Sequence, residues 1–485
     1  MSFDDHFLPD GLHELLAQFG TAIEFSDCFP DGRVDLSSTP VKDDQLADLI
    51  CYPGFAELDL AYTEISDAGM LHIGEMSYLE NLRLEGTRIS DRGIAELTAL
   101  SKLEKLHVGD RETGFRGQRP VPPSRVPRAM DVGDEGLRHL TSLFGLKDLS
   151  IGGTKVTDAG LVRHLPDMPK LEGLSLNLLD IGDEGLAAVR DDLTWLRRID
   201  LTHTGITDDG VFQFLEERQE TLNHVELANT AITDRSLFAL KPSSSIDVLW
   251  LSDTAVTDAS LKTIGQLRSV VQLGLVLTSV TDVGIKYLAD QHVPPQLWLS
   301  QTKITDRSLD YLRGSAVERL WIGSTAVTDA GMKSISELSS LHDLSLMATS
   351  VGDQGLQFLS SSDSLKHLHL MRTKITNAGL ASLESLPLEE LNLSLRLTDD
   401  GLQHISRLSH LQKLNVADAR LSSLGPLTNL SGLKYLSIQN SSALDLSPIQ
   451  ELTNLLWFQF SGPSVSAKSV RQLQRALPEC QIEIV

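Results

Sequence analysis

The sequence predicts an α/β solenoid built from many copies of one strand and one short helix. A phrase of the form Thr-x-Ile/Val-x-Asp-x-Gly-Leu recurs along the 485 residues at steps of 22 to 26 residues, with one longer step of 43. Regular steps of this size are typical of a stacked repeat architecture. Within each repeat the apolar spacing changes from two before the phrase to three or four after it.

The strand of each repeat precedes the phrase. Leu58-Asp59-Leu60 and Leu344-Ser345-Leu346 alternate apolar and polar residues, which is typical of a strand with one buried face. The helix follows the phrase, where Met70, Ile73 and Met76 recur at helical spacing. Each repeat therefore predicts one strand followed by one short helix.

An Asp stands directly before each helical pattern. Because a carboxylate there can accept hydrogen bonds from unpaired first-turn amides, we interpret it as the N-cap of its helix. A column of carboxylates could instead hold cations, but capping accounts for each member locally. Gly or Ser stands two residues later, as expected where a helix start presses on its neighbour, and the Thr is expected to hydrogen-bond the turn backbone. The Asp positions are Asp43, Asp67, Asp91, Asp134, Asp158, Asp183, Asp208, Asp234, Asp258, Asp282, Asp306, Asp329, Asp353 and Asp399, and Asn377 takes the one substituted position.

Both ends of such a stack need covers, because terminal repeats otherwise expose apolar faces. The apolar stripe that predicts an N-terminal helix consists of Leu12, Leu15, Leu16 and Phe19. The apolar residues that predict a C-terminal helix and strand are Val470, Leu473, Leu477, Ile482 and Ile484. We therefore expect a helical cap over residues 1–31, a repeat array over 32–462 and a helix and strand cap over 463–485.

The composition argues against several classes of protein. The 66 Asp and Glu exceed the 42 Lys and Arg, so nucleic acid or an anionic membrane would be approached against the protein's own field. Cys28, Cys51 and Cys480 are too few and too widely spaced for a disulfide framework or a paired-cysteine zinc site. The start shows no secretory leader, and no apolar run of about 18 residues occurs. We expect a cytoplasmic protein.

The repeated phrase resembles the leucine-rich repeat family, and most closely the cysteine-containing subtype of F-box leucine-rich-repeat proteins and many bacterial proteins. The resemblance covers about residues 32–460, with Thr at the position of the subtype's Cys. Two late units, at residues 421–427 and 444–449, resemble the shorter repeats of internalins. The resemblance implies a right-handed solenoid, or horseshoe, with a parallel concave β-sheet and short convex helices. It implies no particular partner.

The long step in the repeat comes from an insertion at residues 111–130. Its four prolines favour extended backbone, and it joins the array near the expected concave rim. It can be interpreted as a tolerated loop on the protein's acidic surface, or as a recognition arm for an acidic or proline-binding partner. Its basic residues, which form a secondary candidate site, are Arg111, Arg116, Arg119, Arg125 and Arg128.

Alternation also predicts which side chains the concave face presents, because the residue between two core leucines points to solvent. Three of the five tryptophans fall in this column, and Gly274 between Trp250 and Trp298 predicts a gap about 10 Å wide walled by indoles. Exposed Trp, Met and Arg are enriched at protein interfaces. The predicted partner-binding patch comprises Trp250, Gly274, Val276, Trp298, Arg319, Trp321, Met347, His367, His369, Met371 and Arg372. The alternatives are indoles that shield one another or that stack on sugars.

Two strand pairs on this face suggest catalysis at first sight. Asp343 and His367 should lie on adjacent strands, as should Ser345 and His369, which is compatible with a hydrolase triad or a metal site. A flat sheet, however, supplies no oxyanion hole and no nucleophile elbow. We therefore predict no catalytic residues, no metal and no other cofactor.

The sequence thus favours a non-enzymatic scaffold, of bacterial origin, that binds a protein on its concave face. From the resemblance, one alternative is the substrate-recognition subunit of a ubiquitin-ligase-like complex. Residues 8–16 resemble the start of an F-box, but the first strand at residues 32–36 leaves too little room for a complete one. The other alternative is a carbohydrate-binding solenoid that uses the tryptophans. We expect no nucleic-acid or membrane partner, and the sequence does not predict an oligomeric state.

Overall fold

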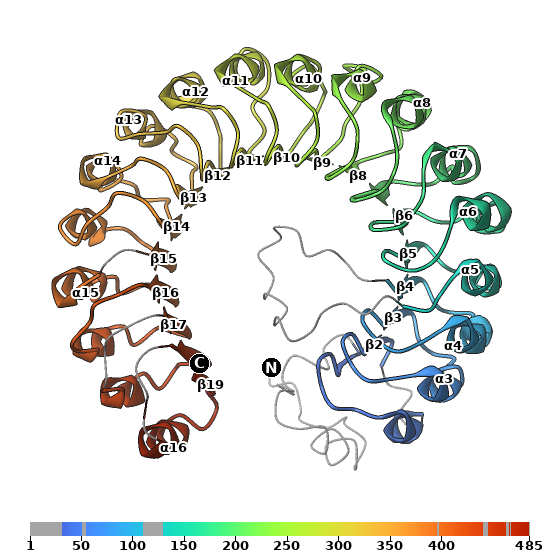
Figure 1. Ribbon diagram of the computed structural model, residues 1–485, viewed down its shortest axis with the longest axis horizontal. Helices are drawn as coiled ribbons and strands as arrows, with labels where there is room; N and C mark the ends of the chain where they lie inside the picture. Colours follow the sequence, from blue (N-terminus) through green and yellow to red (C-terminus); the bar gives the residue numbers. More distant parts are fainter. Residues whose placement is uncertain are drawn as a thin grey trace, which may run out of the picture. The chain divides into compact units, whose positions relative to one another are not determined.

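The computed structural model describes residues 32–50, 55–109, 130–394, 397–439, 445–461, 465 and 467–484. The chain divides into two compact units, unit 1 (Met1–Leu249) and unit 2 (Trp250–Val485). In each unit the strands lie along the inner edge and the helices along the outer edge of successive coils (Figure 1). The predicted N-terminal cap and the five arginines of the insertion lie outside the described residues.

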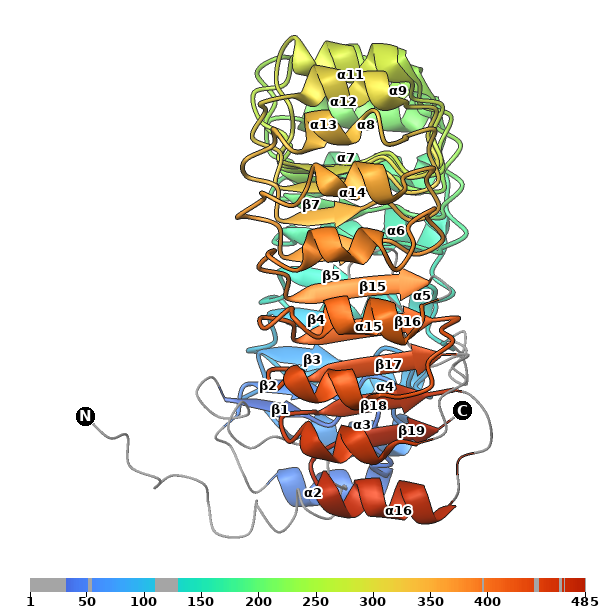
Figure 2. The same cartoon turned by 90° about the vertical axis from the view of Figure 1, so that its left-hand side faces the viewer.

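The strands pair in parallel and in chain order within one 19-stranded sheet, and Figure 2 shows β15 to β19 of unit 2 running side by side. This confirms the predicted fold class. The strands that begin in unit 1 are β1 (Arg33–Asp35), β2 (Glu57–Asp59), β3 (Asn81–Arg83), β4 (Lys105–His107), β5 (Asp148–Ser150), β6 (Gly173–Ser175), β7 (Arg198–Asp200), β8 (His224–Glu226) and β9 (Val248–Trp250). Those of unit 2 are β10 (Gln272–Gly274), β11 (Gln296–Trp298), β12 (Arg319–Trp321), β13 (Asp343–Ser345), β14 (His367–His369), β15 (Glu390–Ser394), β16 (Lys413–Ala417), β17 (Tyr435–Gln439), β18 (Trp457–Phe460) and β19 (Gln481–Ile484).

A short helix or 3-10 turn follows most strands, as the change of apolar spacing predicts. The helical elements of unit 1 are η1 (Asp43–Gln45), α2 (Leu46–Leu49), α3 (Asp67–Ile73), α4 (Asp91–Ala95), η2 (Glu96–Ala99), α5 (Asp134–Leu140), α6 (Asp158–His164), η3 (Leu165–Asp167), α7 (Asp183–Asp192), α8 (Asp208–Arg218) and α9 (Asp234–Leu237). Those of unit 2 are α10 (Asp258–Ile264), α11 (Asp282–Ala289), α12 (Asp306–Leu312), α13 (Met332–Ile335), α14 (Asp353–Gln357), η4 (Gly379–Leu383), α15 (Asp399–Ile405), η5 (Gly425–Asn429), η6 (Ser447–Glu451) and α16 (Ala467–Ala476). None of the helices in the described ranges is long and apolar enough to cross a membrane.

The core lies between the strands and the helices of each coil. Strand registers place equivalent positions side by side, so that Leu58 pairs with Leu82 and Leu344 with Leu368. All four of these leucines are buried. Because side chains alternate along a strand, the residues on either side of each core leucine project from the opposite face. We call this surface the strand face.

The Asp that recurs in the phrase does not act as the predicted N-cap of its helix. The N-cap of α4 is Ser90, whose hydroxyl accepts a hydrogen bond from the Arg92 N–H. Asp67, which begins α3, instead accepts hydrogen bonds from the next coil, from the Ser90 N–H at 2.7 Å and the Ser90 hydroxyl at 2.6 Å. Asp258 accepts the same two bonds from Thr281 at 2.7 and 2.6 Å. The capping interpretation was therefore wrong for the Asp, because its carboxylate links successive coils, and where a side chain caps the helix it is the preceding Ser or Thr. Gly precedes α5, α7 and α14, which have no side-chain cap.

The Gly and the Thr of the phrase make the contacts that the sequence predicts. Gly93 lies against the neighbouring coil, since a Cβ atom built on it would lie 2.5 Å from Asp67 Oδ1. A side chain there would displace the carboxylate that binds Ser90. The Thr87 hydroxyl donates to the Leu84 carbonyl at 2.7 Å, which confirms its bond to the turn backbone.

The repeat changes near the C-terminus in the way the sequence indicates. The late units carry η5 and η6 in place of α-helices, and β15, β16 and β17 lengthen to five residues. At the end, α16 buries Leu473 and precedes β19, which pairs with β18. A helix and a strand thus lie at the predicted C-terminal cap.

Candidate binding surface on the strand face of unit 2

The predicted patch falls within unit 2, on the strand face and the turns that follow it. Two rows of side chains cross this face, one from the first and one from the third residue of each short strand. The first row contains Gln272, Gln296, Arg319, Asp343, His367 and Glu390. The second contains Gly274, Trp298, Trp321, Ser345, His369 and Asn392.

The indoles form a continuous stack. The ring centroids of Trp250 and Trp298 are 4.6 Å apart, those of Trp298 and Trp321 are 6.4 Å apart, and Trp321 meets His369 at 5.7 Å. Trp250 lies directly on Gly274, because a Cβ atom at that glycine would be 2.0 Å from Trp250 Cε3. The predicted gap of about 10 Å between the indoles is therefore absent. Gly274 provides the space, and the two large rings close over it.

This stacking buries two of the three predicted contact tryptophans. Trp250 is 8% exposed and Trp298 is 5% exposed, so the alternative in which the indoles shield one another holds for this pair. The N–H groups of both rings are also buried and lack a hydrogen-bond partner among the described residues. Such donors are uncommon in folded proteins and call for an explanation.

Val276 was also expected to be exposed, and that expectation was wrong. Its side chain is only 1% exposed. The coil before it approaches closely there, since Ser252 Oγ accepts the Val276 N–H at 3.2 Å and the Asp253 N–H donates to the Val276 carbonyl at 2.7 Å. The alternation rule fails at this position because the chain has already left the three-residue strand β10.

The remaining patch residues reach solvent to different degrees. Met347 is 38% exposed, and Leu277, in the turn after β10, is 47% exposed. Arg372 is exposed as well, and it has the same left-handed turn conformation as Leu277, with φ values of 58° and 61°. The half-buried members are Arg319, Trp321, His367, His369 and Met371. The patch thus has a buried indole base with an apolar and basic rim.

Asp343 is the polar centre of the patch. Its carboxylate accepts a hydrogen bond from the Trp321 indole N–H at 3.0 Å and lies 3.8 Å from His367 Nδ1 and 3.7 Å from His369 Nε2. Burial alone would raise the pKa of Asp343, but the two imidazoles and the indole outweigh burial and hold it below its usual value. The same contact raises the pKa of His367. Asp343 therefore stays ionised and fixes the orientation of Trp321.

The strand pairs considered for catalysis are adjacent, with Asp343 opposite His367 and Ser345 opposite His369. The carboxylate already binds the Trp321 indole, and its contacts with both imidazoles exceed hydrogen-bond length. Among the described residues, no group of three or more His, Cys, Asp or Glu side chains has a geometry that could hold a metal ion.

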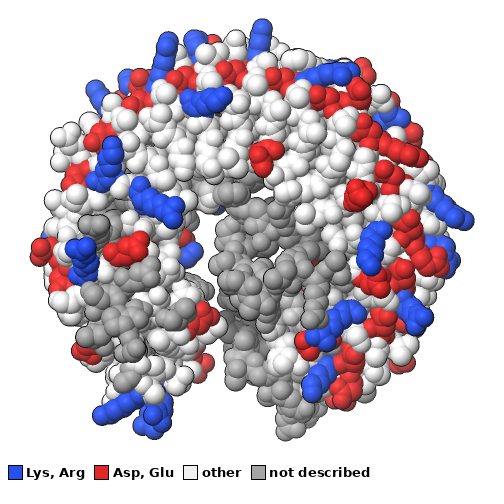
Figure 3. Space-filling view, viewed as in Figure 1, with Lys and Arg blue, Asp and Glu red and all other residues white. Residues whose placement is uncertain are grey.

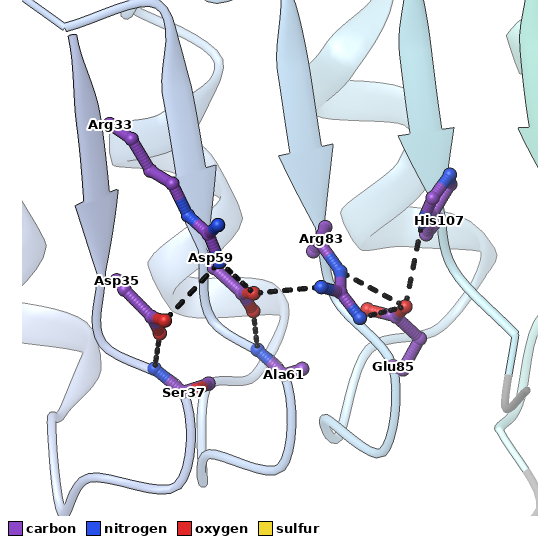
Figure 4. Close-up of polar contacts among 8 residues, drawn as sticks. All are labelled: Arg33, Asp35, Ser37, Asp59, Ala61, Arg83, Glu85 and His107. Atoms are coloured by element: carbon purple, nitrogen blue, oxygen red, sulfur yellow. Dashed lines mark hydrogen bonds and ion pairs between the residues drawn. The ribbon is translucent and has the colours of Figure 1, made fainter. Parts of the chain in front are cut away.

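The strand face of unit 1 carries a charge ladder that the sequence analysis missed (Figure 4). Arg83 pairs with Asp59 at 3.1 Å and with Glu85 at 3.0 Å, while Arg33 reaches Asp59 at 3.4 Å. His107 lies 3.6 Å from Glu85. Although burial opposes it, contact with His107 and Arg83 holds the pKa of Glu85 below its usual value. Opposite charges at equivalent positions of successive repeats were the signal that could have revealed this ladder.

A second feature of unit 1 that was missed is a carboxyl pair. Asp200 and Glu226 lie opposite each other on β7 and β8. Burial, followed by the Glu226 charge, raises the pKa of Asp200 to about 6. Asp200 accepts hydrogen bonds from the Thr202 N–H at 3.0 Å and the Ser175 hydroxyl at 3.1 Å. Two acidic residues at one repeat position in adjacent coils are the sequence signal for this pair.

The chain is similar to known proteins in sequence, over two short segments, and in its fold. A family model described as Leucine Rich repeat matches residues 192–214 and 361–383. The first segment covers β7 and most of α8, and the second covers β14 and η4. No curated protein sequence matches the chain.

Several solved structures are similar. A leucine-rich-repeat protein of Leptospira interrogans is 18% identical with a TM-score of 0.42, over 90% of this chain and 98% of that one. TLR13 in its complex with ssRNA13 is 16% identical with a TM-score of 0.49, over 90% and 72%. The ectodomain of the Arabidopsis receptor kinase HAESA, in complex with an extended IDA peptide hormone, is 15% identical with a TM-score of 0.40, over 88% and 75%.

The family match thus falls on one coil of each unit. Those coils share their phrase, their buried leucines and their parallel strands with the other repeats of the array. The chain is a leucine-rich repeat protein.

Proposed function

We propose that this protein is a non-enzymatic scaffold that binds a protein partner on the strand face of unit 2. Leucine-rich-repeat solenoids generally serve as protein-binding scaffolds, because stacked repeats offer a long continuous surface. The contact surface consists of Trp321, Met347, Arg319, His367, His369, Met371 and Arg372, together with Leu277.

The observation that carries the proposal is the half-buried, fixed indole of Trp321 in a unit that also exposes the apolar side chains of Met347 and Leu277. Asp343 holds its N–H at 3.0 Å, and Trp298 and His369 flank the ring. Trp, Met and Arg are the residues most enriched where partners bind tightly. An indole held in one orientation loses little conformational entropy on binding, which favours affinity.

Trp250 and Trp298 have a supporting role in this proposal. Because they are buried against each other over Gly274, they form a rigid base under Trp321 rather than contacts for a partner. The same stacking leaves fewer free indole faces, and sugar recognition on tryptophan needs free faces. The geometry therefore favours a protein partner over a carbohydrate.

The proposal also includes a cytoplasmic location and a second contact site. Cys480 is buried and free, and burial raises the pKa of its thiol to about 11. A free cysteine is compatible with the cytoplasm, the location we propose. The arginines of the insertion, from Arg111 to Arg128, are proposed as a secondary contact.

The test compares partner capture by the wild-type chain with capture by Trp321→Ala/Met347→Ala. The matched control is Phe358→Ala, which removes a similarly exposed apolar side chain, 41% exposed, at the end of α14. Each chain is immobilised, exposed to lysate of the source cells, and its retained proteins are identified by mass spectrometry. A protein retained by the wild type and by Phe358→Ala but lost from the double variant is the expected result. Equal retention by all three would contradict the proposal.

A further inference from the structure

The arginines within strands differ sharply in their partners. In unit 1, Arg33 and Arg83 pair with Asp59, and Arg198 pairs with Asp148 at 2.7 Å. In unit 2, Arg319 makes neither an ion pair nor a side-chain hydrogen bond with any described residue, and its Nε is buried without a partner. A buried N–H of a charged group that lacks an acceptor is unfavourable, and the acceptor of a bound ligand would offset that cost.

The nearest carboxylate in register does not fill this role. Asp343 lies opposite Arg319 on the next strand, but its oxygens face the Trp321 N–H and the imidazoles of His367 and His369. Arg319 nevertheless acts on its surroundings as a charge. After burial, it is the main cause of the lowered pKa of His342. The guanidinium is therefore charged, half-buried and available on the patch.

An unused acceptor lies opposite Arg319 on the other side. Gln296 is its register partner on β11, and Gln296 Oε1 is buried without a hydrogen-bond partner. An unused donor, Arg319 Nε, and an unused acceptor, Gln296 Oε1, thus belong to part-exposed residues that pair in register. A peptide that carries a carboxylate complements this set, because its backbone supplies N–H groups and its acidic side chain supplies oxygens.

The charge distribution permits an acidic ligand in unit 2. Residues 1–249 carry 23 Lys and Arg against 44 Asp and Glu, whereas residues 250–485 carry 19 against 22. Figure 3 shows acidic side chains along the helix-bearing edge of unit 1, interspersed with basic ones. Nearly all of the protein's net negative charge therefore belongs to unit 1. A ligand bound at Arg319 meets an almost neutral unit.

From these observations we propose that Arg319 binds the carboxylate of an Asp or Glu side chain in a peptide segment of the partner, and that the Gln296 side chain beside it completes the contact. This inference rests on the proposed function, because it assigns a chemistry to the partner of the same face. Arginine suits this role since its planar guanidinium can donate two parallel hydrogen bonds to one carboxylate.

The experiment selects ligands from a display library of short random peptides on the full-length wild-type chain. Selected peptides are synthesised in two forms, with the acidic residue and with its Asn or Gln counterpart. Affinities are measured by fluorescence anisotropy for the wild type, Arg319→Gln, Arg319→Lys and Trp321→Ala. Arg268→Gln is the matched control, because it removes an exposed arginine of unit 2 that lies outside the proposed contact surface. Circular dichroism melting curves confirm that each variant is folded.

We expect the wild type to prefer the acidic form of a peptide by about tenfold or more, since hydrogen bonds to charged groups are the stronger ones. Arg319→Gln should lose this preference, Arg319→Lys should keep part of it, and Arg268→Gln should keep all of it. Two results would overturn the carboxylate inference while the proposed function stands, provided that peptide binding is weakened by Trp321→Ala. In the first, the acidic and amide forms of a peptide bind with the same affinity. In the second, Arg319→Gln keeps the preference for the acidic form. If no selected peptide depends on Trp321, both fail.

Discussion

At the residue scale, Gly274 shows how one missing side chain determines the structure of the patch. Alternation placed it correctly between two tryptophans on the strand face, but alternation does not predict rotamers. Adjacent parallel strands are about 4.8 Å apart, and an indole is wide enough to cover a glycine on the next strand. The space that glycine leaves is therefore filled by Trp250, whose Cε3 would be 2.0 Å from an added Cβ.

This packing predicts that Gly274→Ala displaces Trp250 and disturbs the stack with Trp298. Forcing a methyl group into a filled space costs about 1 to 3 kcal/mol. We expect a lower free energy of unfolding in urea and a red-shifted tryptophan emission in the folded state. Gly432→Ala is the control, because its nearest contact, the Leu411 carbonyl oxygen, is an ordinary 3.7 Å away. Wild-type stability and emission in Gly274→Ala would show that the indoles do not close over this site.

A second residue-scale prediction concerns the dependence of stability on pH. The pKa of Asp200 is raised to about 6 by burial and by Glu226. Folding therefore favours its protonated form, and this stabilising contribution is fully present below about pH 4 and is lost as pH rises through about 6. Asp200→Asn, which mimics the protonated form, should match the wild type near pH 4. Above pH 7 it should be more stable by on the order of 2 kcal/mol.

Urea unfolding at a series of pH values measures this difference. The exposed Asp180→Asn serves as control and should show no such trend. A difference between Asp200→Asn and the wild type that stays constant across this pH range would refute the assignment to Asp200.

At the scale of the element, each coil depends on its neighbour through the Asp of the phrase. Removing the Asp258 carboxylate leaves both the Thr281 N–H and the Thr281 hydroxyl without their acceptor. A lost acceptor of this kind costs about 1 to 3 kcal/mol. We therefore expect Asp258→Ala to lower the free energy of unfolding by that amount, as measured by chemical denaturation. Asp363→Ala, at an exposed position before β14, should change it by less than about 0.5 kcal/mol. Similar losses from both variants would mean that the carboxylate does not link the coils.

The elements were largely predictable because one repeat constrains all the others. The period and the change from strand to helical spacing follow from apolar positions, and the resemblance of two late units to shorter repeats indicated that the array changes near its end. The role of Asp67 did not follow from them, because a carboxylate before a helix looks the same in sequence whether it caps its own helix or binds Ser90 of the next coil. Only the packing of one coil on another separates the two. The Thr-for-Cys subtype stays a prediction.

At the scale of the whole molecule, the sequence predicted which residues lie together on the strand face of unit 2 but not which of them are exposed. Counting strand positions brought Trp250, Trp298 and Trp321 together, as the structure has them. Which of them remains accessible depends on ring packing, and the free guanidinium of Arg319 depends on where the oxygens of Asp343 point. Such details are set by side-chain geometry between coils, which the repeat pattern does not encode. The proposed contact surface is therefore narrower than the predicted patch.

The most direct test of the account is site-specific photo-crosslinking on the folded chain. A photoreactive amino acid replaces Met347 on the proposed surface or, as control, Phe358 at the end of α14. Both chains are irradiated in lysate of the source cells, with and without excess wild-type chain as competitor. The account predicts a distinct crosslinked protein from position 347 that the competitor removes and that position 358 does not give. The account would be contradicted if both positions gave the same crosslinked proteins. It would also be contradicted if the competitor removed no crosslinked protein from position 347.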